Sequence, residues 1–143
     1  MLSKAISIVS QAFEGKTDKG GSPYILHCLR VMSGVNQQDE ELMQIAVLHD
    51  LVEDFPTEWN LVRLANNDFS DRVISALSLL THDKEKVSYD DYIKAIALNE
   101  DARQVKLADL RDNSNITRLK GLSKKDFDRL EKYSRSYIYL SKI

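Results

Sequence analysis

The chain has 143 residues, of which 43% are hydrophobic and 29% charged, and its formal net charge is −2. This length predicts a single domain over residues 1–143, because domains usually have about 100–200 residues. Five glycines and two prolines are too few for the many turns of an all-β sandwich or barrel. The balanced charge, without a basic stripe, excludes a typical nucleic-acid-binding surface.

The single cysteine, Cys28, excludes an intrachain disulfide and a zinc ribbon. No apolar run approaches the roughly 20 residues of a membrane span. The N-terminus lacks the continuous apolar block of a signal peptide. We therefore expect a cytoplasmic protein that contacts no membrane, and no obligate protein partner is evident.

Apolar residues recur at helical spacing along the whole chain. The expected helices cover about residues 2–13, 22–35, 39–54, 57–65, 73–80, 88–98, 101–119 and 123–140. Capping residues mark four of the starts, at Ser22, Thr57, Ser88 and Ser123, and the last two begin capping boxes. A glycine-rich loop at 15–21 separates the first two helices. This pattern predicts an all-α fold of about seven to eight helices.

Two stripes of the segment 39–54 begin apolar and end polar. On one continuous helix they would be Leu42, Ala46, His49, Glu53 and Met43, Val47, Asp50, Asp54. An imidazole and three carboxylates would then enter a partly buried space, which is costly without a compensating charge. Because neighbouring helical residues point about 100° apart, His49 and Asp50 flank a point off the helix where one cation would satisfy both.

Two other expected helices carry a polar residue on an apolar face. His27 follows Tyr24 on one inward face, and Asp109 follows Val105 on another, with Asn113 one turn further on. Imidazole nitrogens together with carboxylate oxygens suit Mn²⁺, Fe²⁺ or Zn²⁺ better than Ca²⁺ or Mg²⁺. The predicted ligands of one divalent ion are His27, His49, Asp50 and Asp109.

These residues also have purely structural interpretations. A single inward histidine such as His27 is more often hydrogen-bonded in the core than bound to a metal. An inward aspartate commonly pairs with a cation, and Arg103 or Lys106 would serve Asp109 in this way. The metal prediction depends on the ordered combination, in which every member lies on an apolar helix face.

Four segments together resemble a known family. In chain order they are GKTDKGGSPYILHCLRVM, AVLHDLVEDF, VKLADLRDN and DFDRLEKY, between about Phe13 and Tyr133. The chain resembles the HD superfamily of metal-dependent phosphohydrolases. Within it, the match is to the hydrolase domain of RelA/SpoT-type proteins and the small alarmone hydrolases. The second segment carries an HD-x-x-ED pattern, which is more specific than HD alone. The resemblance implies an HD-domain helical bundle.

The resemblance also implies roles for single residues. The four predicted ligands match the family's metal ligands, usually for Mn²⁺, and Glu53 and Asp54 match its catalytic acidic pair. Residues that match substrate contacts are Lys19 in the nucleotide loop, Asn113 near the metal and ribose, and Arg129 and Tyr133 late in the chain. For Arg129, a surface ion pair with Asp126 or Asp128 is an equally good expectation.

The chain departs from the family pattern at Asp18, where the alarmone hydrolases usually carry an arginine that helps to hold the purine. A carboxylate at this position either accepts hydrogen bonds from a base edge or pairs with Lys19 and stiffens the loop. Cys28 replaces a usual proline, and Phe13 replaces a usual histidine. These departures affect the expected substrate more than the expected metal.

The implied reaction is Mn²⁺-dependent hydrolysis that removes the 3′-pyrophosphate from (p)ppGpp-type or (p)ppApp-type alarmones. One alternative is an HD phosphohydrolase for another nucleotide, such as a nucleoside 5′-phosphate, a dNTP or NADPH. A second alternative is a non-catalytic HD module that binds a nucleotide. In every case the expected partner is a small-molecule nucleotide, and not a nucleic acid.

Overall fold

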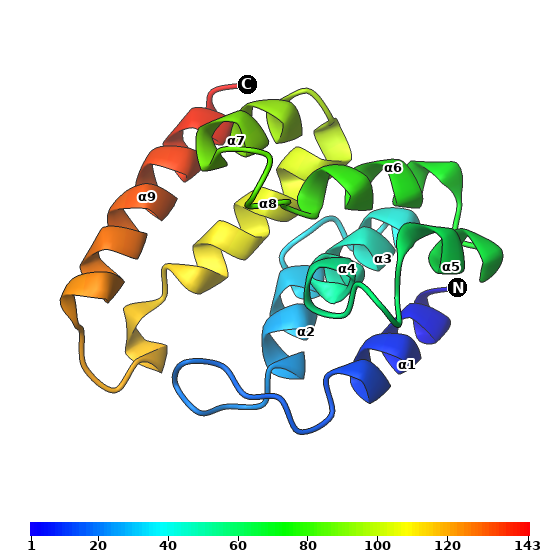
Figure 1. The fold of residues 1–143 in the computed structure, drawn as a ribbon, viewed down its shortest axis with the longest axis horizontal. Coiled ribbons are helices and arrows are strands. Elements are labelled where there is room, and N and C mark those ends of the chain that lie inside the picture. The colour runs from blue at the N-terminus through cyan, green and yellow to red at the C-terminus, as the bar shows by residue number, and fades with distance from the viewer.

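The computed structural model describes all 143 residues, and its regular elements are all helical (Figure 1). They are α1 (Leu2–Ala12), α2 (Ile25–Ser33), α3 (Glu40–Leu48), α4 (Leu51–Asp54), α5 (Leu61–Asn66), α6 (Asp71–Leu80), α7 (Tyr89–Ala97), α8 (Glu100–Asn113), the 3₁₀ turn η1 (Ile116–Arg118) and α9 (Lys124–Ser141). The expected all-α fold is confirmed. If α3 and α4 count as one interrupted segment, the number of α-helices also agrees with the expectation.

Helix α3 is the centre of the bundle. It packs against α1, α2, α6 and α8, and most of its side chains are buried, even that of Gln44. The buried apolar side chains form one continuous cluster of 27 residues. Since burial of apolar surface is the main stabilising term in folding, this core fixes the ends of α2, α3 and α8 relative to one another.

Helix α8 connects the two sides of the molecule. Figure 1 shows it, in yellow, running between α9 and the pair formed by α2 and α3, and it contacts α2, α3, α6, α7 and α9. The loop between α1 and α2 lies at the same end of the molecule as η1. No helix combines the length and the apolar character needed to cross a bilayer.

The expectation of one continuous helix over 39–54 is wrong. The helical hydrogen-bond pattern is interrupted at His49 and Asp50, although both keep αR backbone angles, so that α3 ends at Leu48 and the single turn α4 begins at Leu51. The Nδ1 atom of His49 donates to the Ala46 carbonyl at 2.7 Å. In an uninterrupted helix this carbonyl would accept the amide of residue 50, so the side chain competes for its hydrogen bond.

Two expected helix starts are also wrong. Ser22 does not cap α2, because residues 22–24 pair with the start of the loop, where the Tyr24 amide donates to the Lys16 carbonyl at 2.9 Å. Thr57 does not cap α5. Its N-cap is Asn60, whose side chain accepts the Arg63 amide at 2.8 Å.

The long helix expected over 101–119 ends earlier, at Asn113. The side chain of Asn115 accepts from the amide and hydroxyl of Thr117 and thereby starts the short turn η1. The two serine caps are present. Ser123 and Asp126 form the expected capping box, whereas at Ser88 only the serine half of the box is formed.

Candidate metal centre and adjoining cleft

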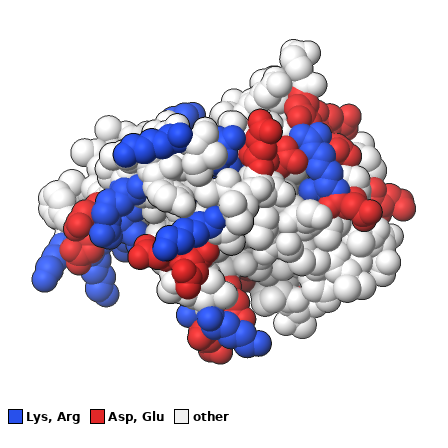
Figure 2. All heavy atoms as spheres, turned by 90° about the horizontal axis from the view of Figure 1, so that it is seen from above, with Lys and Arg blue, Asp and Glu red and all other residues white.

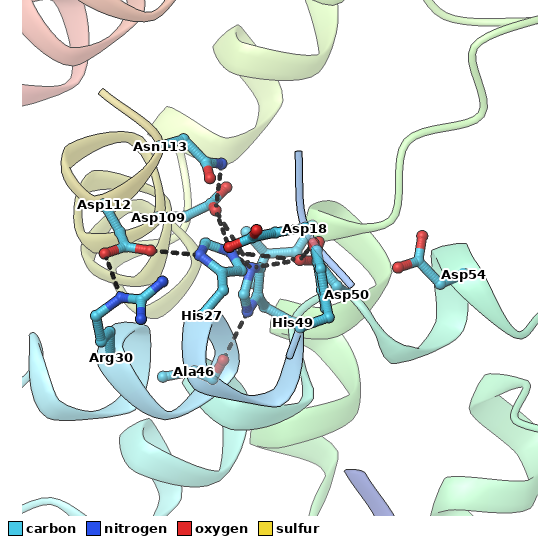
Figure 3. A network of polar contacts seen from close by, with 12 residues as sticks. Asp18, His27, Arg30, Ala46, His49, Asp50, Asp54, Asp109, Asp112 and Asn113 are labelled. Atoms are coloured by element: carbon cyan, nitrogen blue, oxygen red, sulfur yellow. Dashed lines mark hydrogen bonds and ion pairs between the residues drawn. The ribbon is translucent and has the colours of Figure 1, made fainter. Parts of the chain in front are cut away.

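Two histidines and two aspartates from three segments point at one another (Figure 3). His27 comes from α2, His49 and Asp50 from the break after α3, and Asp109 from α8. The Nε2 atoms of His27 and His49 are 3.3 Å apart. Asp109 Oδ1 lies 3.1 Å from His27 Nε2, and Asp50 Oδ2 lies 2.9 Å from His49 Nε2. The structure therefore brings all four predicted ligands together.

These spacings fit a single transition-metal ion. Donors about 2.0–2.2 Å from an ion lie about 2.8–3.6 Å apart at tetrahedral angles or at adjacent octahedral positions. All four donor atoms here lie within 4.8 Å of one another. The side chains of His27, His49 and Asp109 are only 2%, 3% and 5% exposed. A cation at this point would compensate carboxylates that are otherwise costly to bury.

The remaining imidazole nitrogens orient both histidines toward this point. His27 Nδ1 lies 2.6 Å from Asp112 Oδ2, and His49 Nδ1 lies 2.7 Å from the Ala46 carbonyl. Both partners are pure acceptors, so each Nδ1 carries the proton. If a metal replaced the second ring proton, each Nε2 would present a lone pair toward the other donors, as metal-ligating histidines require.

The local electrostatics strongly favour positive charge at the same point. Burial by itself would lower the pKa of His27, but its hydrogen bonds to Asp109, Asp112 and Asp50 raise this pKa to about 11. Burial also opposes the charged form of His49, and the nearby Asp50 and Asp109 nevertheless raise its pKa to about 10. Without a metal, protons would supply the charge that the carboxylates demand.

Three further groups hold the two candidate aspartate ligands in place. The Tyr24 hydroxyl donates to Asp50 Oδ2 at 2.6 Å. Lys106 Nζ pairs with Asp109 Oδ2 at 2.9 Å, so the structure selects Lys106 rather than Arg103 as the cation that serves Asp109. The side-chain amide of Asn113 donates to Asp109 Oδ1 at 3.0 Å.

A cleft of about 360 Å³ lies between the loop at 15–21, η1 and the start of α9. All five predicted substrate-contact residues line it: Asp18, Lys19, Asn113, Arg129 and Tyr133. Tyr24 and Asn113, which contact the two clustered aspartates, line the same cleft. The cleft therefore adjoins the four-residue cluster.

Asp18 is occupied by contacts within the chain. Its Oδ1 accepts the amides of Gly20 and Ser22 at 2.9 Å and 3.0 Å. Its Oδ2 pairs with Arg118 Nη1 at 3.2 Å. The carboxylate thus stiffens the loop, which was one of the two roles expected for Asp18. Its cationic partner, however, is Arg118 and not the expected Lys19. Arg129 forms the expected ion pair with Asp126 and still lines the cleft.

The two predicted catalytic carboxylates are not among the four clustered residues. Glu53 Oε1 accepts the backbone amide of His82 at 2.8 Å. Asp54 Oδ2 pairs with Lys16 Nζ at 2.7 Å, and Figure 3 shows Asp54 set apart from the cluster on α4. Lys16 itself lines the cleft, so the pair links Asp54 to its wall. The catalytic roles of Glu53 and Asp54 stay predictions.

The sequence analysis missed three residues of this network. The Asp112 carboxylate accepts from His27 Nδ1 and from Arg30 Nε at 2.8 Å, and it forms an ion pair with Arg118 Nη2 at 3.3 Å. Burial raises the pKa of Asp112, but the His27 and Arg30 hydrogen bonds and the Arg118 charge lower it to about 2. A signal was available, because Arg30 and Asp112 each follow a predicted ligand by three residues and so share its helix face.

Comparison with curated proteins found three bacterial relatives with the same sequence identity and coverage. Among them are the bifunctional (p)ppGpp synthase/hydrolase SpoT of Escherichia coli (strain K12) and a guanosine-3′,5′-bis(diphosphate) 3′-pyrophosphohydrolase of Shigella flexneri. Each is 31% identical over 121 residues, which cover 78% of this chain and 17% of the relative. The chain therefore spans less than a fifth of the length of these relatives. No family model matches the chain.

The fold has a solved counterpart in a metazoan SpoT ortholog, described as hydrolysing ppGpp and playing a role in starvation responses. The two structures superpose with a TM-score of 0.79 and 20% sequence identity, over 97% of this chain and 84% of the ortholog. This chain is a SpoT homologue with the fold of an HD-type hydrolase domain. The resemblance noted in the sequence is thereby confirmed.

Proposed function

We propose that the chain is a Mn²⁺-dependent hydrolase that removes the 3′-pyrophosphate from (p)ppGpp-type or (p)ppApp-type alarmones. The observation that carries this proposal is the convergence of His27, His49, Asp50 and Asp109 beside a cleft lined by cations. The names of the bacterial relatives and the description of the metazoan ortholog support the same substrate class.

In this proposal the four clustered residues hold one divalent ion. The mixed nitrogen and oxygen donors favour Mn²⁺, with Fe²⁺ and Zn²⁺ as alternatives. When bound, such an ion acts as a Lewis acid that polarises a phosphoryl oxygen and lowers the pKa of water. The protein contributes the fixed donor geometry and, through Lys106 and Asn113, the orientation of Asp109.

The cleft residues bind and orient the polyphosphate and nucleoside. Lys19 has no carboxylate within ion-pair distance, and its pKa is lowered by burial and by the nearby charge of Arg129. Two neighbouring cations without full compensation are suited to a polyanion. Tyr133 offers a ring beside them, on which a base or ribose can pack.

Glu53 and Asp54 move protons in the proposed reaction. One would take a proton from the attacking water and the other would give one to the leaving ribose oxygen. Lys16 holds the Asp54 carboxylate beside the cleft wall, because it contacts both. The backbone amide of His82 fixes Glu53 in a similar way.

A nucleotide panel tests the proposal. The purified chain is incubated with Mn²⁺ and ppGpp, ppApp, nucleoside 5′-phosphates, dNTPs or NADPH, and the products are separated by anion-exchange chromatography. The expected result is release of pyrophosphate from ppGpp or ppApp and none with a chelator. Turnover of another nucleotide alone would reassign the substrate, and binding without turnover of any nucleotide would contradict an enzymatic role.

A further inference from the structure

A continuous line of charged contacts joins the loop over the cleft to the metal-ligating His27. Asp18 Oδ2 pairs with Arg118 Nη1 at 3.2 Å. Arg118 Nη2 donates to the Asp112 carbonyl at 2.7 Å and lies 3.3 Å from Asp112 Oδ2. Asp112 Oδ2 accepts from His27 Nδ1 at 2.6 Å. The line joins two stretches that are far apart in the sequence, residues 18–27 and 112–118.

At one end of this line, the loop and η1 behave as one docked piece. Asp18 folds the loop by accepting the amides of Gly20 and Ser22. Gly20 lies so close to η1 that a Cβ atom there would be only 2.0 Å from the Arg118 carbonyl oxygen. Arg118 therefore anchors the loop through both its backbone and its guanidinium.

At the other end, Asp112 decides how His27 presents its free nitrogen. The carboxylate accepts a hydrogen bond from Nδ1–H, so Nε2 points at the other three donors. Arg30 and Arg118 hold the carboxylate from two sides, and its side chain is only 12% exposed. Moving either guanidinium would move the carboxylate, and with it the imidazole.

We propose that Arg118 is a positioning residue that couples the loop at 15–21 to the metal centre, orienting His27 through Asp112 and holding the loop through Asp18. The proposal deepens the proposed function and rests on its metal site. It explains why a carboxylate stands at position 18: Asp18 holds Arg118 instead of touching the substrate. A change in the loop should consequently alter metal affinity, although no loop residue is a ligand.

Two substitutions cut the line at different points. In Asp18→Asn, the side-chain oxygen still accepts the loop amides, but the charge that faces Arg118 is lost. In Arg118→Gln, the ion pairs with both Asp18 and Asp112 are lost. Outer partners of metal ligands typically contribute about 10–100-fold to metal affinity. Calorimetric titration with Mn²⁺ should therefore show a loss of about tenfold or more for Arg118→Gln and a smaller loss for Asp18→Asn. The double variant should be no worse than Arg118→Gln, because the same link is already cut.

Arg129→Gln is the matched control. It removes a guanidinium from the same cleft, but its ion-pair partner Asp126 lies outside the line to His27. This variant should bind nucleotide more weakly and keep the Mn²⁺ affinity of the wild type. If Arg118→Gln and Asp18→Asn also kept it, the proposed coupling would be overturned. An equal loss in Arg129→Gln would overturn it too, because the effect would then come from the general charge of the cleft.

Two metal-free measurements separate this proposal from the proposed function. The ¹⁵N shift of His27 Nδ1 reports its hydrogen bond to Asp112, and limited proteolysis reports how firmly the loop is held. Both should change in Arg118→Gln, and loop cleavage should also accelerate in Asp18→Asn. If the wild type bound no Mn²⁺, the proposed function would fail, whereas unchanged shifts and cleavage in both variants would refute the coupling itself.

Discussion

Asp109 shows at the scale of one residue how the fold prepares a candidate metal ligand. Burial raises its pKa, but the charges of Lys106 and His49 and its hydrogen bonds hold that pKa well below the usual 3.8. The carboxylate is therefore ionised across the neutral range. Lys106 occupies its Oδ2 and leaves Oδ1 facing the two histidines. The different partners of the two Asp109 oxygens follow from the packing of the helices and not from the position of Asp109 in the sequence.

Removing a predicted ligand should remove the metal. We expect His49→Ala and Asp109→Ala to retain less than a tenth of the Mn²⁺ bound by the wild type in elemental analysis after gel filtration. His82→Ala is the control, because His82 stacks on Tyr92 outside the cluster. Stoichiometric metal in a His49→Ala, Asp109→Ala double variant would disprove the assignment.

The proposed acid–base pair should be needed for turnover and not for metal binding. Glu53→Gln and Asp54→Asn keep the shape of each side chain while removing its charge. We expect kcat to fall about 10²–10⁴-fold, the usual contribution of general acid–base catalysis, with Mn²⁺ content unchanged. Steady-state rates on the identified nucleotide test this, and full activity of Asp54→Asn would exclude Asp54 from the chemistry.

At the scale of elements, the site depends on short interruptions between helices. The break between α3 and α4 turns His49 and Asp50 toward one point, and the turn η1 brings Arg118 to the loop. Both interruptions form where a side chain takes a backbone hydrogen bond, at His49 and at Asn115. Polar side chains that compete with the helix thereby position the functional groups.

The contact between the loop and η1 predicts a strong effect of Gly20→Ala. The added Cβ would overlap the Arg118 carbonyl oxygen at 2.0 Å, so the loop must move away from the cleft wall. We expect KM for the nucleotide to rise about tenfold or more, the equivalent of about 1.4 kcal/mol. Gly15→Ala is the control. It is strained by a φ of +81° but meets no neighbouring atom within 4 Å, so its KM should stay near that of the wild type.

A surface ion cluster at the ends of α3, α6 and α8 predicts a pH-dependent stability difference. Arg72 pairs with Asp39 at 2.6 Å and with Asp101 at 2.8 Å, and Figure 2 shows a basic side chain among acidic ones on one side of the molecule. The Arg72 hydrogen bond, opposed by slight burial, lowers the pKa of Asp39 below 3.8. The ionised Asp39 carboxylate therefore stabilises the fold fully above pH 3.8, the pKa of an ordinary aspartate. This stabilisation is lost as the pH falls through the lower pKa that Asp39 has in the folded protein.

Asp39→Asn tests this contribution, because asparagine is an equally good N-cap for α3. We expect the free energy of unfolding to fall by less than about 1 kcal/mol at pH 7, the usual range for exposed pairs. The difference should shrink progressively as the pH falls below 3.8. Urea unfolding at several pH values measures it, and a difference that persisted at low pH would assign the effect to capping.

At the scale of the whole molecule, an ion at the cluster would tie together positions 27, 49–50 and 109. These lie on α2, in the break after α3, and on α8, all of which pack on the common core. Because the unfolded chain does not bring these ligands together, binding energy becomes folding energy. The metal should therefore stabilise the bundle as a unit.

Thermal unfolding with Mn²⁺ measures that coupling. At a free concentration 100 times the dissociation constant, one site adds about 2.7 kcal/mol of stability, or a rise in Tm of several degrees for a domain of this size. His49→Ala should show no such rise. A similar shift in this variant would mean that Mn²⁺ acts elsewhere on the chain.

The fold class and the four candidate ligands were accessible from the sequence. Apolar residues at helical spacing define helices because each helix must bury one face. His27, His49, Asp50 and Asp109 stood out because polar groups on such faces are costly unless they are compensated. These are local properties of the chain, so they need no knowledge of how the helices pack.

Only the tertiary structure decided which residues meet. The pairing of Asp18 with Arg118 joins positions 100 residues apart, and the contacts of Asp112 with His27 join positions 85 apart. The break at His49 and the early end of α8 were also not evident from periodicity. A side chain's partner depends on packing across the whole core, whereas helical spacing reports only on the nearest turns. For that reason the chain's local pattern identified the candidate ligands, and the fold determined what orients them.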